Sequence, residues 1–385
     1  MESKKWVAVW GNAPSVANTR PTSYAKDITL RYNCKTTVDA QKIRLQFTNF
    51  CGREDVSLAK VTVGINNGGN AVCADTLKTV LFGGSTTAVI KKGGNIKSDE
   101  IDLKMTAGQS ATVSIYLKDF TDMRTCVHIT GVLSDGWFAL GDKTGADVLP
   151  IDDTRKINSY YFLNTLEVLT DSGASCCILY GDSITAEDWP DYLTQIIVNS
   201  GRKDIATLRR AASGTRVLGR YDCAEYAHYG LSGKDRFESE TDVAGADTVF
   251  VLHGINDIIH PDGINPWRPM SNMPTAEDLI NGFRYYIKTA HKKGLKIVFS
   301  TLLPIKNWRT YAPFRETVRQ QVNDWIKSTD ETDGYIDLSA AVEDPADRTA
   351  FKDIYDSGDH LHPSAAGYEK MAQTFFDVFY KGVKV

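Results

Sequence analysis

The feature that most constrains the fold of this 385-residue chain is a change of sequence pattern near residue 172. Before that point, apolar and polar residues alternate in short runs, with turn-forming glycine and asparagine between them. Three such runs occupy residues 42–48, 59–65 and 111–117. Short strands without intervening amphipathic helices favour two packed antiparallel sheets, so residues 1–172 are predicted to form a jelly-roll-like β-sandwich domain.

From residue 173 onwards, short apolar runs alternate with amphipathic helices. The apolar runs are 177–180, 248–252, 297–303 and 335–338, and each is short enough to be a buried parallel strand. One helix is expected to begin at the N-cap Thr275 and to end before Gly294. Two later helices are expected to bury Phe314, Val318, Val322 and Trp325, and Tyr368, Met371, Phe375 and Phe379. Residues 173–385 are therefore predicted to form an α/β domain with helices on both faces of a parallel sheet.

Composition narrows the classes of partner. A net charge of −4 gives no basic surface for nucleic acid, and no apolar run approaches the about 20 residues that span a membrane. The first residues lack the apolar core of a signal peptide. The seven cysteines are scattered without C-x-x-C spacing, which argues against a disulfide framework or a zinc site. We expect a cytoplasmic protein without cofactor, nucleic-acid partner or membrane partner, and its oligomeric state is left open.

The first predicted parallel strand ends in Gly181-Asp182-Ser183. Ligands of parallel sheets bind at the carboxyl ends of the strands, where a serine at the start of a helix exposes its hydroxyl. In isolation, the segment fits equally well a turn in which Ser183 or Asp182 caps the following helix.

The next two strands are followed by Ser213-Gly214 and by His253-Gly254-Ile255-Asn256. A glycine in such a place can turn its N–H inward, and an asparagine can donate to a developing oxyanion. Taken singly, Gly214 is more typical of an ordinary loop and Asn256 of a helix cap. His253 fits a structural histidine better than a residue that faces the ligand.

Asp359 and His362 stand three residues apart, just before the last predicted helix. Within such a turn, an aspartate can orient the imidazole and favour its protonated form. Alternatively, the pair could be a cap beside a surface histidine or half of a metal site. A metal would need further ligands, for which Asp182 is the only obvious candidate, so no metal site is predicted.

Together, these segments supply a nucleophile, two oxyanion donors, a base and a residue that orients the base. Three further residues are weaker candidates for substrate contact: Asp182, His253 and Trp267. Trp267 lies in the turn-rich segment 261–274, which could offer an aromatic platform to a sugar ring or could simply be a surface loop.

These segments, in this order over residues 175–385, resemble the sequence blocks of the SGNH/GDSL hydrolase superfamily. The segments 6–14, 43–52, 301–304 and 355–362 are similar to an acetyl-xylan-esterase-like subgroup that has a β-rich leading half. The resemblance implies a flavodoxin-like parallel sheet preceded by a β-sandwich, and deacetylation of carbohydrates as the activity.

The resemblance also implies a role for each site residue. Ser183 is then the nucleophile, His362 the general base and later the acid, and Asp359 the residue that orients His362. The N–H groups of Ser183 and Gly214 and the side chain of Asn256 form the oxyanion hole. The sequence departs from the pattern at residues 185–189, where many relatives have a glycine, and its acidic residues could reshape the acyl pocket.

The implied substrate is an acetylated oligosaccharide of the plant cell wall, such as a xylan fragment. One alternative is a hydrolase of short-chain lipid esters, aryl esters or thioesters with the same fold, although the small and acidic segment 185–188 favours acetate. Another is a carbohydrate-binding protein that has lost catalysis, against which the intact catalytic set argues. The sugar, the acetylated position and any substrate contact of the β-rich half are left open.

Overall fold

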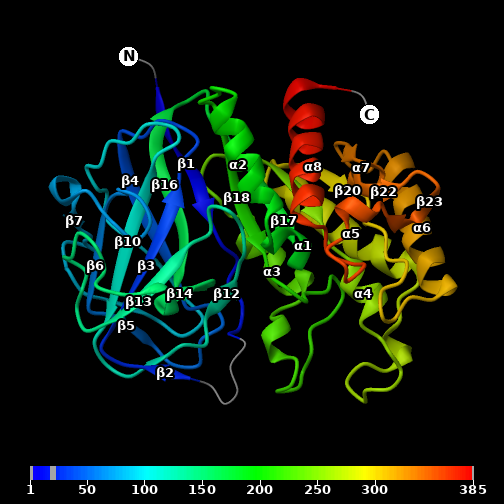
Figure 1. Cartoon of the computed structure of the whole chain (residues 1–385), viewed down its shortest axis with the longest axis horizontal. Coiled ribbons are helices and arrows are strands. Elements are labelled where there is room, and N and C mark those ends of the chain that lie inside the picture. The colour runs from blue at the N-terminus through cyan, green and yellow to red at the C-terminus, as the bar shows by residue number, and fades with distance from the viewer. Residues whose placement is uncertain (1–2, 18–22, 384–385) are drawn as a thin grey trace. The chain divides into compact units, whose positions relative to one another are not determined.

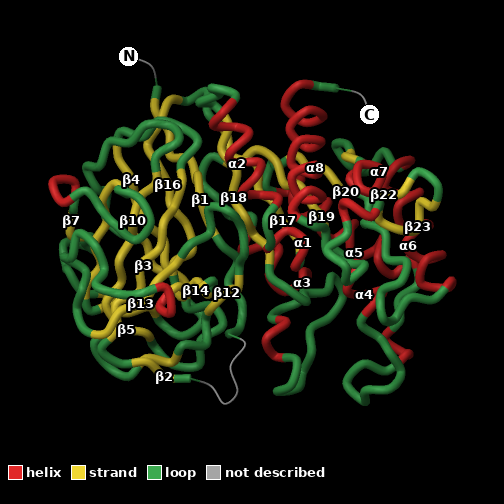
Figure 2. The backbone as a smooth tube through the Cα atoms, in the orientation of Figure 1, coloured by secondary structure: helices red, strands yellow, loops and turns green. Residues whose placement is uncertain are grey.

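The computed structural model describes residues 3–17 and 23–383 (Figure 1). The chain divides into two compact units. The first comprises Met1–Cys176, Ile197–Arg209 and Val243–Ala246, and the second comprises Cys177–Ile196, Arg210–Asp242 and Asp247–Val385. Apart from two short 3₁₀ turns, the helices drawn in red in Figure 2 follow Gly181, whereas the described residues before it form strands and loops.

The first unit is built on two antiparallel sheets. One has the order β1-β16-β4-β9, formed by β1 (Lys4–Gly11), β16 (Leu163–Asp171), β4 (Lys42–Thr48) and β9 (Asn95–Lys97). The other has the order β14-β13-β3-β10-β6-β7, formed by β14 (Lys156–Ile157), β13 (Gly136–Leu140), β3 (Ile28–Lys35), β10 (Ser110–Leu117), β6 (Lys60–Ile65) and β7 (Lys78–Thr79).

Smaller elements complete this unit. Three two-stranded pairs are β2 (Tyr24–Ala25) with β11 (Thr121–Asp122), β5 (Val56–Leu58) with β8 (Ala88–Ile90), and β12 (Cys126–His128) with β15 (Ser159–Tyr161). The two 3₁₀ turns are η1 (Ala74–Thr76) and η2 (Asp153–Arg155). The alternation predicted for β4 is confirmed, because Ile43, Leu45 and Phe47 are fully buried while the residues between them are partly exposed.

The second part of the chain carries a five-stranded sheet of order β18-β17-β19-β20-β21. Its strands are β17 (Ser175–Gly181), β18 (Ile205–Ala211), β19 (Ala246–Leu252), β20 (Lys296–Ser300) and β21 (Tyr335–Ile336). The pairs β19–β20 and β20–β21 are parallel. In chain order this is the 2-1-3-4-5 arrangement of flavodoxin-like sheets, so the predicted fold class is confirmed.

Helices and short turns connect these strands. The α-helices are α1 (Ser183–Ala186), α2 (Trp189–Asn199), α3 (Gly233–Glu240), α4 (Ile255–Ile259), α5 (Ala276–Lys292), α6 (Pro313–Ser328), α7 (Leu338–Val342) and α8 (Ala365–Phe375). The remaining elements are the 3₁₀ turns η3 (Ala227–Tyr229), η4 (Met270–Asn272) and η5 (Asp353–Tyr355), the π-helical turn η6 (Phe376–Tyr380), and the hairpin of β22 (Glu343–Asp344) and β23 (Asp347–Phe351).

Helix α5 has the ends that the sequence predicts. Thr275 is its N-cap and forms a capping box with Asp278, which satisfies backbone N–H groups that the first turn leaves unpaired. At the other end Gly294 has a φ of +73°, a conformation that glycine adopts without steric cost. Both ends of α5 could therefore be predicted from the residues that flank the helix.

The prediction for the buried face of α6 is wrong in part. Val322 is buried as expected, but Phe314 is half exposed, and the buried face instead contains Arg315, Glu316, Arg319 and Asn323. Arg319 pairs with Glu316 at 2.6 Å and donates to the carbonyl oxygen of Leu302 at 2.7 Å. These bonds satisfy the buried charges, so a face that reads as polar in the sequence packs inward.

The last helix begins at the predicted N-cap, Ser364, whose side chain accepts a hydrogen bond from the N–H of Gly367. Tyr368, Met371 and Phe375 are buried as predicted, whereas Phe379 is only partly buried. The helix changes to a π-helical turn over Phe376–Tyr380, which shifts the side-chain period and buries Phe376 instead.

All seven cysteines are free thiols. Within the described ranges 3–17 and 23–383, no helix combines the length and the apolar character that crossing a membrane requires.

Candidate active site

Ser183 is the first residue of α1, directly after the end of β17. Gly181 ends that strand where it lies against its neighbour: a Cβ atom on it would stand 2.4 Å from the carbonyl oxygen of Leu252. Asp182 then caps α1 by accepting a hydrogen bond from the N–H of Ile184. A glycine and a capping aspartate thus turn the chain sharply, which places Ser183 at the carboxyl end of the sheet.

Ser183, His362 and Asp359 form one hydrogen-bonded chain. Ser183 Oγ lies 2.8 Å from His362 Nε2, and His362 Nδ1 lies 2.6 Å from Asp359 Oδ2. The other carboxylate oxygen of Asp359 accepts the backbone N–H groups of Leu361 and His362 at 2.9 and 2.8 Å. The turn that holds the aspartate thereby also fixes the imidazole, and the structure brings these three residues together as predicted.

The surroundings push the pKa values of the acid–base pair apart. Burial acts to lower the pKa of His362, but the hydrogen bond that its ring donates to Asp359 and the charge of Glu187 outweigh it, so the pKa is raised. Burial acts to raise the pKa of Asp359, yet the hydrogen bonds from the side chain and backbone of His362 dominate and hold that pKa well below its usual range. Asp359 is therefore ionised at neutral pH and stabilises a proton on His362.

The predicted oxyanion donors lie on two segments that contact each other. Gly214 has a φ of +76°, and the ring of Tyr229 occupies the space that a Cβ atom would need, so only glycine fits. The side-chain N–H of Asn256 donates to the carbonyl oxygen of Thr215, the residue after Gly214, at 3.0 Å. An asparagine amide has two N–H bonds, so one remains for a substrate oxygen.

Two of the weaker candidates for substrate contact are buried. Asp182 is 1% exposed, and its burial raises its pKa to about 7. His253 is also 1% exposed; its Nε2 lies 3.1 Å from the carbonyl oxygen of Thr215, and its Nδ1 lies 3.1 Å from the hydroxyl of Tyr286. Both side chains support neighbouring segments. Trp267 is different, since 52% of it is exposed on the segment 261–274.

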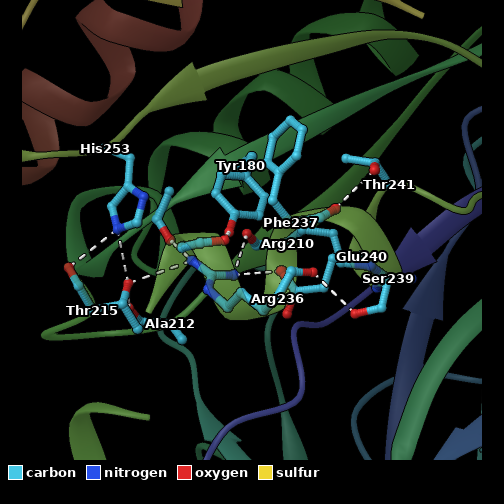
Figure 3. Close-up of polar contacts among 12 residues, drawn as sticks. Tyr180, Arg210, Ala212, Thr215, Arg236, Phe237, Ser239, Glu240, Thr241 and His253 are labelled. Atoms are coloured by element: carbon cyan, nitrogen blue, oxygen red, sulfur yellow. Dashed lines mark hydrogen bonds and ion pairs between the residues drawn. The ribbon is translucent and has the colours of Figure 1, made fainter. Parts of the chain in front are cut away.

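Sequence reasoning missed Arg236 on α3, which ties the site segments together (Figure 3). Its guanidinium donates to the carbonyl oxygens of Gly181 and Arg210 at 2.7 and 3.2 Å, and to the hydroxyl of Thr215 at 3.4 Å. The fully buried charge is paired with Glu240 and lies 4.3 Å from the ring centre of Tyr180. In the sequence, the spacing of Arg236 and Glu240 indicates only an ordinary i, i+4 pair.

Glu187 adds a second carboxylate beside His362. One of its oxygens lies 4.0 Å from His362 Nε2, and the other accepts the hydroxyl of Tyr368 on α8 at 2.6 Å. The sequence indicated that the acidic residues after Ser183 could reshape the acyl pocket, and the structure gives one of them a defined place next to His362 Nε2.

This arrangement contains a hydroxyl bonded to a partly buried imidazole, an ionised carboxylate behind it, and N–H donors on neighbouring loops. Such a set can activate a serine for attack on an acyl carbon. Within the described residues, no three His, Cys, Asp or Glu side chains are grouped to hold a metal ion.

Comparisons with known proteins address the same part of the chain. The model of the GDSL-like lipase/acylhydrolase family matches residues 179–370, a stretch that contains every segment described above. No curated protein matches the chain.

Several solved structures are similar to this chain. One is a variant of Axe2, an acetyl xylan esterase from Geobacillus stearothermophilus, with 20% identity over 55% of this chain and 99% of that chain and a TM-score of 0.41. The lipase/acylhydrolase from Enterococcus faecalis has 20% identity over 55% and 97% of the two chains and a TM-score of 0.40. A GDSL-like lipase from Bacteroides thetaiotaomicron has 16% identity over 54% and 89% and a TM-score of 0.39.

Proposed function

Residues 179–370 belong to the GDSL-like lipase/acylhydrolase family, and on that premise we propose that the chain is a serine esterase that forms an acyl-Ser183 intermediate. The observation that carries this proposal is the 2.8 Å hydrogen bond between Ser183 Oγ and His362 Nε2, continued by Asp359. A serine hydroxyl is a weak nucleophile at its own pKa, so a base within hydrogen-bond reach is the first requirement.

In the proposed reaction, His362 removes the proton of Ser183 as the oxygen attacks the ester carbonyl. The N–H groups of Ser183 and Gly214 and the free N–H of Asn256 receive the oxyanion, and each such donor lowers the barrier by about 3–4 kcal/mol in comparable sites. Imidazolium then gives its proton to the leaving alkoxide. Water, activated by the same imidazole, hydrolyses the acyl-enzyme and frees Ser183.

We propose further that the acyl group is acetyl and that the alcohol belongs to a carbohydrate. Glu187 and Tyr368 stand beside His362 Nε2, and a long apolar acyl chain placed there would have to strip water from a carboxylate. Acetate avoids that cost. The resemblance of residues 6–14 and 355–362 to the acetyl-xylan-esterase-like subgroup supports a sugar as the alcohol.

Free thiols at all seven cysteines agree with a reducing compartment, so we place the reaction on imported oligosaccharide fragments in the cytoplasm.

Acetate release tests this proposal. Wild type and Ser183→Ala are incubated with acetylated xylan fragments, acetylated mannan fragments and p-nitrophenyl esters of increasing chain length. We expect wild type alone to act, on at least one carbohydrate and on the shortest aryl esters only. A preference for longer acyl chains would favour a lipid esterase, and binding of oligosaccharides without release would favour a carbohydrate-binding protein.

A further inference from the structure

Beside the oxyanion segments lies a tyrosine–arginine cluster, defined by Arg216, Tyr221, Tyr226, Tyr229, His260 and Arg268. All six belong to the second unit, on the loops that follow β18 and β19. The proposed esterase mechanism uses none of them.

The two guanidinium groups of the cluster lie over tyrosine rings. Arg216 is 4.1 Å from the ring centre of Tyr221, and Arg268 is 4.1 Å from that of Tyr226. Arg268 also donates to the hydroxyl of Tyr229 at 3.2 Å, and the rings of Tyr226 and Tyr229 are stacked 5.7 Å apart. Contacts of this kind hold both guanidinium groups against the rings.

Among the residues that the structure describes, neither positive charge forms an ion pair, although the carboxylates of Asp257 and Asp262 interact with Arg216 and Arg268 from beyond ion-pair distance. Arg216 and Arg268 are each 8% exposed, yet no carboxylate in the described part of the chain lies within ion-pair distance of either. The nearby carboxylates are already engaged: Asp257 accepts the N–H groups of Val217 and Leu218 at 2.7 and 3.0 Å. Asp262 likewise accepts the backbone N–H groups of the two loop residues 264 and 265.

Four buried polar atoms of this cluster have no hydrogen-bond partner among the described residues. The Nε atoms of Arg216 and Arg268, the hydroxyl of Tyr221 and Nδ1 of His260 are all buried without a hydrogen-bond partner. The other buried arginines of this unit differ among themselves: Arg236 is paired with Glu240 and Arg319 with Glu316, whereas Arg315 donates to the carbonyl oxygens of Ile258 and Pro261. Unpaired buried charge is costly, so a cluster of this kind indicates a ligand of opposite charge.

The cluster adjoins the proposed oxyanion hole directly. The ring of Tyr229 fills the space next to Gly214, and Arg216 follows Gly214 by two residues. His260 lies one helical turn after Asn256 and is stacked on Tyr229 at 5.0 Å. A group bound by the two arginines would therefore belong to the same molecule as an ester at Ser183.

We propose that Arg216 and Arg268 bind a carboxylate on the alcohol part of the substrate, which makes the preferred substrate an acetylated acidic sugar such as a uronic-acid oligosaccharide. This inference rests on the proposed esterase function and deepens it. The guanidinium fork matches a planar carboxylate, and the partly exposed faces of Tyr226 and Tyr229 suit the sugar ring that carries it.

Matched neutral and acidic substrates test the inference. Initial rates are measured on acetylated xylo-oligosaccharides and on acetylated galacturonic-acid oligosaccharides of equal length. We expect wild type to prefer the acidic substrate by about 10-fold or more in kcat/KM, and Arg216→Met or Arg268→Met to abolish that preference. Arg268→Lys should restore only part of it, because it keeps the charge and loses the fork.

The matched control is Arg284→Met. Arg284 is also near an aromatic ring, with its guanidinium 5.9 Å from the ring centre of Trp325, but it is ion-paired with Glu277 and Glu331. This variant should keep the wild-type ratio of acidic to neutral rates. Equal rates on both substrates, or a ratio that survives both Arg→Met changes, would overturn the inference and leave the esterase proposal standing.

A binding measurement separates the two proposals and does not depend on turnover. Calorimetry with Ser183→Ala and unacetylated galacturonic-acid oligosaccharide should show binding that is lost when Arg216→Met is added. Such binding without hydrolysis by wild type would keep the anion site and reject the esterase. Absence of binding, or equal competition by inorganic phosphate, would reject the acidic-sugar site.

Discussion

His362 and His253 both lie in the second unit, but their surroundings shift their pKa values in opposite directions. Both side chains are largely buried and both contact a residue of a proposed catalytic segment. The pKa of His253 is lowered well below its usual value by burial and by the charge of Arg236, whereas the carboxylates beside His362 overcome its burial and raise the pKa. Burial beside an arginine therefore favours a neutral structural histidine, and burial beside carboxylates favours one that can take up a proton.

A third histidine shows that a carboxylate is not sufficient either. His360 Nδ1 lies 2.6 Å from Asp356 Oδ2, the same separation as in the His362–Asp359 pair. Two His–Asp pairs thus occur in one loop, and only His362 has a serine hydroxyl on its other nitrogen. Contact with Ser183 is what distinguishes the proposed catalytic pair.

The largest expected effect comes from removing the imidazole that contacts Ser183. His362→Asn should lower kcat/KM for an acetate ester by about 1,000-fold or more, because it removes the base that is hydrogen-bonded to Ser183 Oγ. The matched control is His360→Asn, in which asparagine suits the φ of +64° at that position. It should keep activity within about twofold. Comparable losses in the two variants would show that the loop acts through its conformation and not through the imidazole of His362.

The next effect concerns Asn256. We expect Asn256→Ala to lower kcat by about 100-fold or more through loss of an oxyanion donor. Since Asn256 also holds the carbonyl oxygen of Thr215, His253→Leu serves as a comparison that removes a different bond to the same residue. If His253→Leu lowered kcat as much as Asn256→Ala, the asparagine would act by positioning Thr215, not by binding the oxyanion.

Asp359→Asn should lower kcat/KM by less than His362→Asn does, because an asparagine oxygen can still accept the backbone N–H groups that shape the turn. The charge is lost, however, so the pKa of His362 should fall and the acid limb of the pH–rate profile should move to lower pH. An unchanged acid limb would show that Asp359 does not stabilise the imidazolium.

The smallest expected effect tests how the charge of Glu187 acts on the pKa of His362. A raised pKa keeps His362 protonated and inactive at higher pH, so removing the charge of Glu187 should shift the acid limb downwards by up to about one pH unit. In Glu187→Gln, kcat at high pH should change little. Tyr368→Phe, which removes the hydroxyl that holds Glu187, should shift the limb less. An upward shift in Glu187→Gln would contradict the proposed role.

Much of the fold could be predicted because local patterns decided it. The alternation in Lys42–Thr48 matches β4 residue for residue, and the capping box at Thr275 places the start of α5. The face of α6 could not be predicted, since Arg319 and Glu316 are buried through a pairing with each other and with the carbonyl oxygen of Leu302. Tertiary hydrogen bonds of that kind leave no periodic signal in the sequence.

The candidate site likewise contains residues that could be predicted from the sequence and residues that could not. Ser183, Gly214, Asn256, Asp359 and His362 each follow a predicted element, so sequence position and type were enough to select them. Arg236 was missed because its role depends on hydrogen bonds to three acceptors in segments that are distant in the sequence. The lack of an ion pair at Arg216 and Arg268 is equally invisible in a sequence, because it depends on how close the fold brings the nearby carboxylates.

The central claim is that Ser183 is the acylated nucleophile, and trapping tests it most directly. Wild type and Ser183→Ala are treated with a fluorophosphonate ester, and the intact mass and the labelled peptide are then measured. We predict one adduct, on Ser183 of wild type, together with loss of esterase activity. Ser183→Ala should form no adduct. Acetate release that persists in Ser183→Ala, or labelling at another residue that abolishes activity, would contradict it.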